Sequence, residues 1–442
     1  MNWLEKDLKY VWHPFTQMKE HSPILIERAK GVWLYDDKGK KYIDGISSWW
    51  VNTLGHSNDR LNKVLYEQAQ TMEHVIFSGF THKSAIELAE KLVELTCPRL
   101  TKVFYSDNGS TAVEVALKMA YQYQVHKGKP EKCKFIAFEN SYHGDTIGAV
   151  SVGGVDLYHK VYKPLLFEIF QGHSPYCYRC PVGKAQEECA CECLGSTEEI
   201  LKMHSNEIAG VIIEPLVQCA GGMIMYPPKH LVRLRELCDK YGVFLILDEV
   251  ATGFYRTGKL FAYEHAGIEP DIMCIAKGIT AGYMPLSVTL ASDEIYNAFY
   301  DEWDKFKTFF HGHSYTANPL AVRIAVENLK ILEEENIAHV VEVKSKLLKS
   351  ELEKLRSLPY VGDVRTAGMI GAIELVGDKR TKESFESSKR IGMQVYRRAL
   401  ELGALLRPLG DVIYFMPPYI INEDELKSLV SIARQAIEEL KP

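Results

Sequence analysis

The stretches 243-VFLILDEVATGF-254 and 273-MCIAKGITAGY-283 decide the fold of this chain. Each consists of a short apolar run, a charged residue directly after that run, and a turn that contains glycine. The charged residue is Asp248 in the first stretch and Lys277 in the second. In an open α/β sheet, residues at the carboxyl ends of the strands face the ligand crevice. We therefore expect an acid and an amine to lie together at one edge of a sheet.

This pair of residues suits the chemistry of pyridoxal phosphate. A lysine forms a Schiff base with the aldehyde of that cofactor, and a carboxylate keeps the pyridine nitrogen protonated so that the ring accepts electrons. The alternative for Asp248 and Lys277 is a surface ion pair between two strand ends. The rest of the chain has to decide between these two interpretations.

Apolar runs and amphipathic helical segments alternate from about residue 60 to residue 318. Examples are the runs KFIAFE (134–139) and GVIIEP (210–215) and the helical segment TAVEVALKMAYQY (111–123). Continuous apolar strands that alternate with such helices are typical of a mainly parallel sheet covered on both faces. The predicted fold class is therefore α/β.

The two ends of the chain have a different pattern. Residues 24–46 predict a hairpin, and long helical segments with short strands follow Pro319. A chain of 442 residues also exceeds the roughly 250–300 residues that one core usually supports. We predict a large domain and a smaller α+β domain built from both ends, divided as residues 1–60 (joining the small domain), 61–318 (large domain) and 319–442 (small domain).

Composition narrows the class of protein further. The chain is 46% apolar and 25% charged, as in ordinary globular proteins, and its net charge is −6. That charge argues against a nucleic-acid binder and favours small-molecule partners. No run approaches the roughly 20 apolar residues that span a bilayer, and the first residues show no secretory signal. We expect a cytoplasmic enzyme with no membrane segment.

A cysteine-rich segment lies in the middle of the chain. Five of the ten cysteines fall into a CxxC pattern followed by CxCxC, at positions 177, 180, 189, 191 and 193. Thiolates at such spacing can close a tetrahedral zinc site. The alternative is a surface loop of reduced thiols, or of bridged ones in a hot or oxidising host. The sequence leaves the choice open, and no catalytic signature adjoins the segment.

Two turns at strand ends are candidates for cofactor contacts. In SDNGST (106–111), Gly109 lets the backbone approach a ligand, and Ser110 offers a hydroxyl at a helix start, which suits a phosphate group. A plain helix cap would also explain this turn. In SYHGDT (141–146), Tyr142 could stack on the cofactor ring, with Val250 on the other face. The alternative there is a loop before a capped helix.

The order of the motifs resembles that of the class III pyridoxal-phosphate aminotransferases. The shared elements are NGS, YHGDT, EPLVQCAGG, LDEVATGFYRTG, CIAKGITAGYMPL and HGHSYTANP. The segments WHPFTQM, SSWW and LLRPLGDVIYFMPP resemble the branch of the family that acts in biotin synthesis. The resemblance runs from Trp12 to Pro418. It implies fold type I of these enzymes, with a large sheet of seven strands, and a homodimer.

The resemblance also implies roles for individual residues around the cofactor. Lys277 would bind the cofactor and move the proton during catalysis, and Asp248 would pair with the pyridine nitrogen. Gly109 and Ser110 would hold the phosphate from one side. In place of the usual Pro–Thr this chain has His313 and Ser314, which would reach the phosphate across the dimer interface. Tyr142 and Val250 would flank the ring, and no metal is expected in this site.

Further residues would bind the substrate. Trp50 would form a wall, Gly312 would offer a backbone contact, and Arg407 would clamp a distal carboxylate, since guanidinium binds carboxylate bidentately. Arg256 is a second cationic candidate. The alternative for either arginine is a surface salt bridge. The substrate contacts implied by the resemblance are Phe15, Trp50, Tyr142, Arg256, Lys277, Gly312 and Arg407.

The activity implied by the resemblance is amino transfer from S-adenosylmethionine to 8-amino-7-oxononanoate, which gives 7,8-diaminononanoate. Many relatives have Tyr where this chain has Phe15, and a branch with Phe is associated with lysine as donor, so the donor stays open. Two rival functions are those of a class III enzyme for ω-amino acids and of a non-catalytic regulator that binds the cofactor. Assembly beyond a dimer is not predicted.

Overall fold

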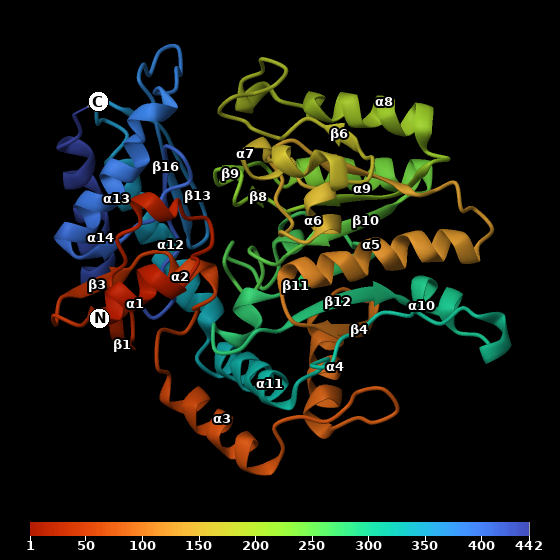
Figure 1. Cartoon of the computed structure of the whole chain (residues 1–442). Coiled ribbons are helices and arrows are strands. Elements are labelled where there is room, and N and C mark those ends of the chain that lie inside the picture. The colour runs from red at the N-terminus through yellow and green to blue at the C-terminus, as the bar shows by residue number, and fades with distance from the viewer. Residues whose placement is uncertain (442) are drawn as a thin grey trace.

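The computed structural model describes residues 1–441, except the side chain of residue 187. Figure 1 shows two groups of elements side by side: a large sheet with its helices, and a smaller group in which the first and last parts of the chain lie together. Within the described residues, the large sheet has seven strands. In spatial order they are β4 (Leu100–Ser106), β12 (Ser287–Ser292), β11 (Ile272–Ile275), β10 (Phe244–Asp248), β7 (Ile208–Ile213), β5 (Lys134–Phe138) and β6 (Phe170–Gly172).

The large sheet is mainly parallel, as the sequence predicts. β12 runs antiparallel to both of its neighbours, β11 and β4, whereas β10, β11, β7, β5 and β6 form parallel pairs. The central strands are buried along their whole length, which explains their unbroken apolar runs. The predicted α/β class is confirmed.

Helices cover both faces of this sheet because the side chains of each strand alternate between the faces. On β10, Ile246 packs with residues of α5 (Gly109–His126), while Leu245 and Leu247 pack in the cluster that contains α9 (Lys229–Tyr241). Figure 1 shows α5 lying along the sheet beside β12, with α9 and α8 above it in this view. Further helices beside the sheet are α3 (Asp59–Thr71), α4 (Lys83–Leu95), α6 (Ile147–Ser151), α7 (Asp156–His159), α8 (Gly195–His204) and α10 (Asp293–Phe299).

The smaller group joins the two ends of the chain. β2 (Trp33–Asp36) and β3 (Lys41–Asp44) form the predicted hairpin, β1 (Ile26–Lys30) pairs with β2 as a third antiparallel strand, and β15 (Ala404–Leu405) adds to β3 in parallel. A second sheet consists of β13 (Val361–Ala367), β14 (Ile370–Leu375) and β16 (Val412–Phe415). The helices of this group are α1 (Trp3–Tyr10), α2 (Ser47–Trp50), α12 (Ile337–Glu353), α13 (Ile391–Leu402) and α14 (Glu423–Glu438).

α11 (Pro319–Glu334) connects the two groups. It begins at Pro319, where the sequence predicts the start of long helical segments, with Asn318 as its cap. It packs against α3 and α4 beside the large sheet and then leads into α12. For this reason we keep the division at residue 318 as a proposal. A two-stranded ribbon, β8 (Val217–Gln218) with β9 (Ile224–Met225), lies at the sheet edge that carries the site. Among the described residues, none of the helices has the length and apolar character needed to span a bilayer.

Candidate active site

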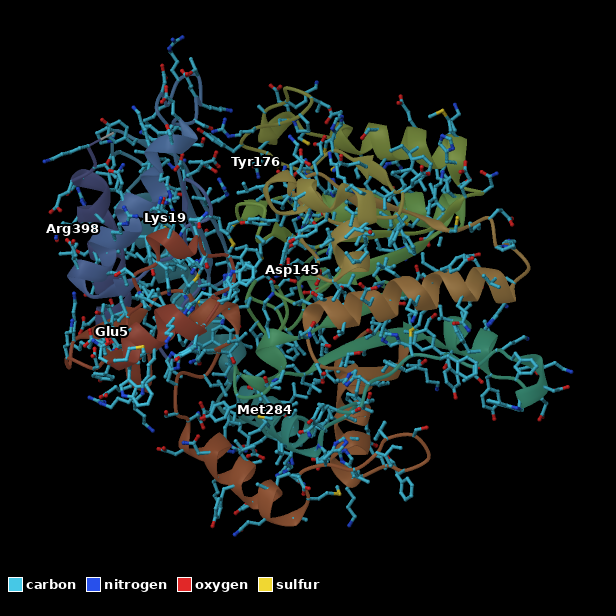
Figure 2. The ribbon with its side chains drawn as sticks, viewed as in Figure 1. Glu5, Lys19, Asp145, Tyr176, Met284 and Arg398 are labelled. Atoms are coloured by element: carbon cyan, nitrogen blue, oxygen red, sulfur yellow. The ribbon has the colours of Figure 1, made fainter. Side chains whose placement is uncertain are left out.

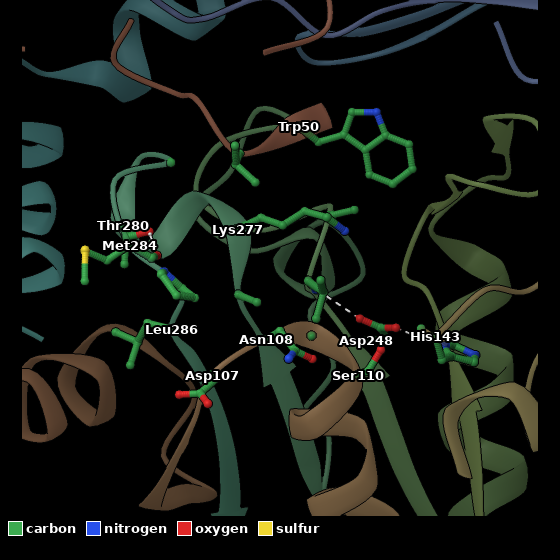
Figure 3. Close-up of a pocket in the computed structure, with 18 of the residues that line it drawn as sticks. Trp50, Asp107, Asn108, Ser110, His143, Asp248, Lys277, Thr280, Met284 and Leu286 are labelled. Atoms are coloured by element: carbon green, nitrogen blue, oxygen red, sulfur yellow. Dashed lines mark hydrogen bonds and ion pairs between the residues drawn. The ribbon is translucent and has the colours of Figure 1, made fainter. Parts of the chain in front are cut away.

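Asp248 lies at the centre of the carboxyl edge of the large sheet and is held by two groups. His143 Nδ1 is 2.7 Å from Asp248 Oδ2, and the backbone N–H of Val250 donates to Asp248 Oδ1 at 3.0 Å. Figure 3 shows both contacts. The carboxylate is 4% exposed. Among the described side chains, the Asp248 carboxylate pairs with the His143 ring and not with the Lys277 amine. The surface ion pair that the sequence left open is therefore not formed.

Lys277 follows β11 and enters a cavity of about 460 Å³ that is also lined by Asp248, Ser110 and Tyr142. Burial lowers the pKa of the Lys277 ammonium, whereas the charge of Asp248 raises it by a smaller amount. A lowered pKa makes an amine a better nucleophile near neutral pH. The residue has a φ of 49°, a left-handed conformation that side chains rarely adopt outside functional sites. Its Nζ lies 4.7 Å from the centre of the Trp50 ring.

The start of α5 forms one end of this cavity. Asn108 caps the helix and accepts from the N–H of Thr111, and the first helical turn leaves backbone N–H groups free for an anion. A Cβ at Gly109 would lie 2.7 Å from Val250 Cγ1, so only glycine fits there. Ser110 Oγ accepts from the N–H of Asp145 at 2.9 Å. A Cβ at Gly144 (φ 123°) would meet Ser110 Oγ at 1.8 Å.

These contacts form a cradle that fits a phosphate group, because the helix start, a hydroxyl and two side-chain-free glycines converge there. The amine of Lys277 and the carboxylate of Asp248 lie in the walls of the same cavity. Tyr142 and Val250 line it as well, with Val250 held against Gly109. The residues present therefore fit pyridoxal phosphate.

Two residues of the site were not assigned from the sequence. Glu214 follows β7, and its carboxylate accepts from the N–H groups of Tyr142 at 3.1 Å and Cys219 at 2.9 Å. Burial raises the pKa of Glu214 to about 7. His143, the partner of Asp248, is 3% exposed. The signal for Glu214 is the same as for Asp248, since it is a charged residue directly after a buried apolar run.

A second cavity, of about 700 Å³, adjoins the first and shares Trp50, Tyr142 and Lys277 with it. Arg407 lies in its wall. The guanidinium is 5.3 Å from the Trp49 ring centre, and its Nη2 donates to the carbonyl of Phe15 at 3.3 Å. Among the described residues, no carboxylate lies within ion-pair distance of Arg407. The arginine is therefore available to an anionic ligand, and the surface salt bridge is not formed.

Aromatic side chains surround this second cavity. The Phe15 ring meets the Trp49 ring edge-on at 5.6 Å and the Tyr158 ring at 5.5 Å. Trp50 packs edge-on against Tyr414 at 6.0 Å. The side chain of Tyr142 donates its hydroxyl to Asp145 at 2.7 Å. The cavity therefore has apolar walls between Lys277 and Arg407, and it suits a chain with a carboxylate at its far end.

The SSWW segment forms a left-handed turn. All four residues of α2 have positive φ angles between 46° and 78°, although none is glycine. Left-handed backbone costs roughly 1–2 kcal/mol per side-chain-bearing residue. The buried carboxylate of Asp44 offsets part of this cost, because it accepts from the Ser48 N–H at 2.9 Å and the Ser48 hydroxyl at 2.7 Å. The turn directs Trp50 toward Lys277 and Trp49 toward Arg407.

Arg256 does not reach either cavity, which corrects its prediction as a substrate contact. It is 1% exposed, and its guanidinium donates to the backbone carbonyls of Pro417 at 2.9 Å and of Trp50 and Asn52 at 3.2 Å. Its guanidinium carbon also lies 4.9 Å from the centre of the Tyr419 ring. With both of its terminal nitrogens bonded to main-chain oxygens, Arg256 fixes the backbone behind Trp50.

The loop that carries Gly312, His313 and Ser314 lies beside the cofactor end but lines neither cavity. Gly312 and Ser314 are exposed. His313 Nδ1 is 3.4 Å from the carboxylate of Asp107, which neighbours the phosphate cradle. The structure describes one chain, so the contact of this loop with a partner's phosphate stays a prediction.

The cysteine-rich segment lies apart from these cavities. All ten cysteines of the chain are free thiols. The Cys191 N–H donates to Cys189 Sγ at 3.2 Å, and the pKa of Cys177 and of Cys193 is raised by burial and by the neighbouring cysteines. Within residues 1–441, these sulfur atoms do not gather three together at metal-ligand spacing. Their role stays open.

Comparison with known proteins gives consistent results. The family model described as Aminotransferase class-III matches residues 15–437. The adenosylmethionine-8-amino-7-oxononanoate aminotransferase of Geobacter sulfurreducens is 49% identical over 98% of this chain and 96% of its own length. The solved structure of the enzyme with that name from Methanocaldococcus jannaschii superposes with a TM-score of 0.94 at 42% identity, covering 98% of each chain. The ω-transaminase of Pseudomonas jessenii in complex with PMP superposes with a TM-score of 0.95 at 35% identity, covering 99% of this chain and 98% of its own.

Proposed function

The chain belongs to the class-III aminotransferase family and is an aminotransferase, and from this premise we propose its substrates. The proposed reaction transfers the amino group of S-adenosylmethionine to 8-amino-7-oxononanoate and gives 7,8-diaminononanoate for biotin biosynthesis. The identity of 41–49% to relatives with this name, over nearly the whole chain, supports the proposal. Identity to the ω-transaminase structures is lower, at 34–35%.

One structural observation carries the assignment. Lys277 lies where the two cavities meet, and Arg407, without a carboxylate partner among the described residues, lies in the wall of the second. The walls between them are aromatic. An acceptor with a keto group at one end and a carboxylate beyond an apolar chain would place these groups at Lys277 and Arg407. Charge-assisted pairing of guanidinium and carboxylate would then fix the position of the substrate in the cavity.

The cofactor we propose is pyridoxal 5′-phosphate. When bound, it supplies an electrophilic aldehyde and a ring that accepts electrons. Gly109 and Ser110 would hold its phosphate at the start of α5, and Tyr142 and Val250 would flank its ring. Asp248, fixed by His143, would stabilise the proton on the ring nitrogen, because a buried carboxylate favours a neighbouring positive charge.

The residues of the chain then perform the remaining chemistry. Lys277 would anchor the cofactor, and as the general base and acid it would take and return the proton. Its lowered pKa leaves a larger fraction of the amine unprotonated for this task. Because Trp50 and Tyr142 line both cavities, donor and acceptor use one pocket in turn, and we expect ping-pong kinetics.

We also propose that the enzyme acts as a homodimer. The loop with His313 and Ser314 lies beside the cofactor end and is partly exposed, so it could contact the phosphate in the other protomer's site. A hydroxyl at position 314 would keep the contact that the family usually makes with threonine. A monomer would then lack part of its phosphate site.

A half-reaction assay tests the function. Purified holoenzyme is mixed with S-adenosylmethionine or with lysine, and the cofactor absorbance is followed. Then 8-amino-7-oxononanoate is added, and the diamine is detected by mass. We expect diamine with S-adenosylmethionine. Diamine with lysine alone would reassign the donor and make Phe15 a marker of that choice.

The same assay and a complementation experiment separate the rival functions. Failure to form diamine with either donor, together with amination of succinic semialdehyde, would contradict the proposal in favour of an ω-amino acid aminotransferase. A non-catalytic regulator would retain its effect in the cell after Lys277→Ala, whereas we expect that variant to lose complementation of a biotin auxotroph.

A further inference from the structure

Three side chains close to the N-terminus converge outside the two cavities of the active site. They are Asp7 in α1, His13 in the segment that follows, and His21 after the short helical turn Met18–Glu20. His13 Nε2 lies 3.0 Å from both carboxylate oxygens of Asp7, and His21 Nε2 lies 3.8 Å from Asp7 Oδ2. The imidazole rings are 4.2 Å apart between centres, tilted by 44°. One ligand atom of each residue lies within 4.8 Å of the other two.

Hydrogen bonding does not account for this arrangement. A single N–H at His13 Nε2 is enough to pair that ring with Asp7. His21 Nε2 is nevertheless buried and, among the described residues, has no hydrogen-bond partner. A buried polar nitrogen without a partner is destabilising, because it has lost its hydrogen bonds to water. Two imidazole nitrogens that face one carboxylate are therefore better explained by a ligand that they share.

The chemistry of the three groups points to that ligand. Zinc binds imidazole nitrogen and carboxylate oxygen at about 2.0–2.2 Å, so ligand atoms in a tetrahedral site lie roughly 3.3 Å apart. The distances of 3.0 and 3.8 Å between the histidine nitrogens and Asp7 are close to this value. Imidazole ligands favour Zn²⁺, Co²⁺ and Ni²⁺ over Mg²⁺ and Ca²⁺. We propose that Asp7, His13 and His21 bind a divalent transition-metal ion of the zinc type.

The position of the site suggests its consequence. His13 and His21 line a cavity of about 760 Å³ together with Phe15 and Arg407. Glu20, next to His21, forms an ion pair with Arg390 beside α13. Figure 2 shows Glu5 of α1 and Lys19 on the same side of the molecule as α13. A bound ion would cross-link residues 7–21 and so hold the segment that carries Phe15 against the substrate cavity. The role is structural, since no reacting group lies at the site.

The test measures bound metal rather than activity. Holoenzyme is dialysed against a chelator. Zn²⁺ or Co²⁺ is then added at a molar concentration that exceeds the protein by one equivalent, and free metal is removed by gel filtration. Metal per chain is then measured by mass spectrometry. The variants are His21→Ala and Asp7→Asn. A matched control is His339→Ala, which removes an exposed histidine that lies 3.8 Å from Glu342 on α12. A second control replaces Cys177 and Cys180 by serine.

We expect the wild type and both controls to hold one more equivalent of metal than His21→Ala and Asp7→Asn. Equal metal content in the wild type and either of these two variants would overturn the proposal, as would loss of that equivalent only in the cysteine control.

Limited proteolysis gives a second measurement. Zn²⁺ should slow cleavage between residues 11 and 17 in the wild type and in the His339→Ala control, and a lack of protection in the wild type would also overturn it. Neither outcome depends on which amino donor the enzyme uses.

Discussion

The cofactor end and the substrate end of the pocket are built in different ways. The cofactor end consists of residues at the carboxyl ends of neighbouring strands of one sheet, such as Asp248, the last residue of β10, and Lys277, two residues after β11. The substrate end combines Phe15, the left-handed turn at Trp50 and Arg407, which come from distant parts of the chain. Strand ends fix side chains rigidly for chemistry. A wall assembled from both chain ends can change its residues without disturbing that chemistry.

The largest expected effect concerns the cofactor end. Asp248→Asn removes the carboxylate that would stabilise the protonated ring nitrogen, and we expect kcat to fall about 10³-fold. Steady-state kinetics with the same donor and acceptor measure this loss. The matched control is Asp145→Asn. The Asp145 side chain accepts only from the Tyr142 hydroxyl, and the hydrogen bond to Ser110 Oγ comes from the Asp145 backbone N–H, which the substitution keeps. A smaller loss for Asp248→Asn than for the control would contradict the roles assigned to the two acids.

Buried acids at the strand ends also make the stability of the cofactor end depend on pH. Burial raises the pKa of Glu249 to about 7 from its ordinary value of 4.5. Between these two values the folded state binds more protons than the unfolded state, so stability falls as the pH rises. The unfolding free energy of the wild type minus that of Glu249→Gln should become smaller by roughly 3 kcal/mol between pH 4.5 and a pH above 7.

Urea unfolding at several pH values measures this difference. The glutamine variant is the right comparison because it keeps an acceptor for the Tyr263 N–H and a polar partner for Thr252, but cannot ionise. A difference that is constant with pH, or that grows as the pH rises, would contradict the raised pKa.

At the substrate end we expect a change in binding rather than in chemistry. Arg407→Met removes the guanidinium but keeps an apolar side chain of similar length, so the KM for 8-amino-7-oxononanoate should rise about 30-fold, or about 2 kcal/mol. The kcat should change little, and Arg407→Lys should fall between the two, because lysine keeps the charge without the planar fork. An unchanged KM in Arg407→Met would place the carboxylate elsewhere.

The smallest effect tests the strain in the turn that carries Trp50. Ser48→Ala and Ser48→Gly both remove the hydroxyl that donates to Asp44, but only glycine adopts a φ of 46° without strain. The glycine variant should therefore be about 1 kcal/mol more stable than the alanine variant in urea unfolding. Equal stability, or greater stability of the alanine variant, would show that the turn is not strained.

The same contrast explains what could be predicted from the sequence. Asp248, Lys277 and the turn at Gly109 follow apolar runs, and local patterns of this kind report strand ends and helix starts directly. Glu214 carries the same signal after β7, although it was not assigned to the site from the sequence. Arg407 was expected to clamp a carboxylate and Arg256 was a second candidate, but only the packing of distant segments shows that Arg407 alone of the two lines the cavity.

The left-handed turn of SSWW and the cluster of Asp7, His13 and His21 gave no local signal either. Serine and tryptophan are not residues that favour positive φ, so the buried Asp44 and the backbone contacts of Arg256 impose the turn. The spacing of the three metal-ligand candidates matches no common motif, and the return of the chain past α1 brings them together.

The central claim is that Lys277 is the residue to which the cofactor is attached. The most direct measurement is reduction of the holoenzyme with borohydride, followed by proteolysis and mass spectrometry. We predict that the mass of the reduced cofactor is found on the peptide that contains Lys277, and on no peptide after Lys277→Ala. Attachment at a different lysine, or an unchanged adduct in the variant, would contradict the roles assigned to the cofactor end, on which the proposed function rests.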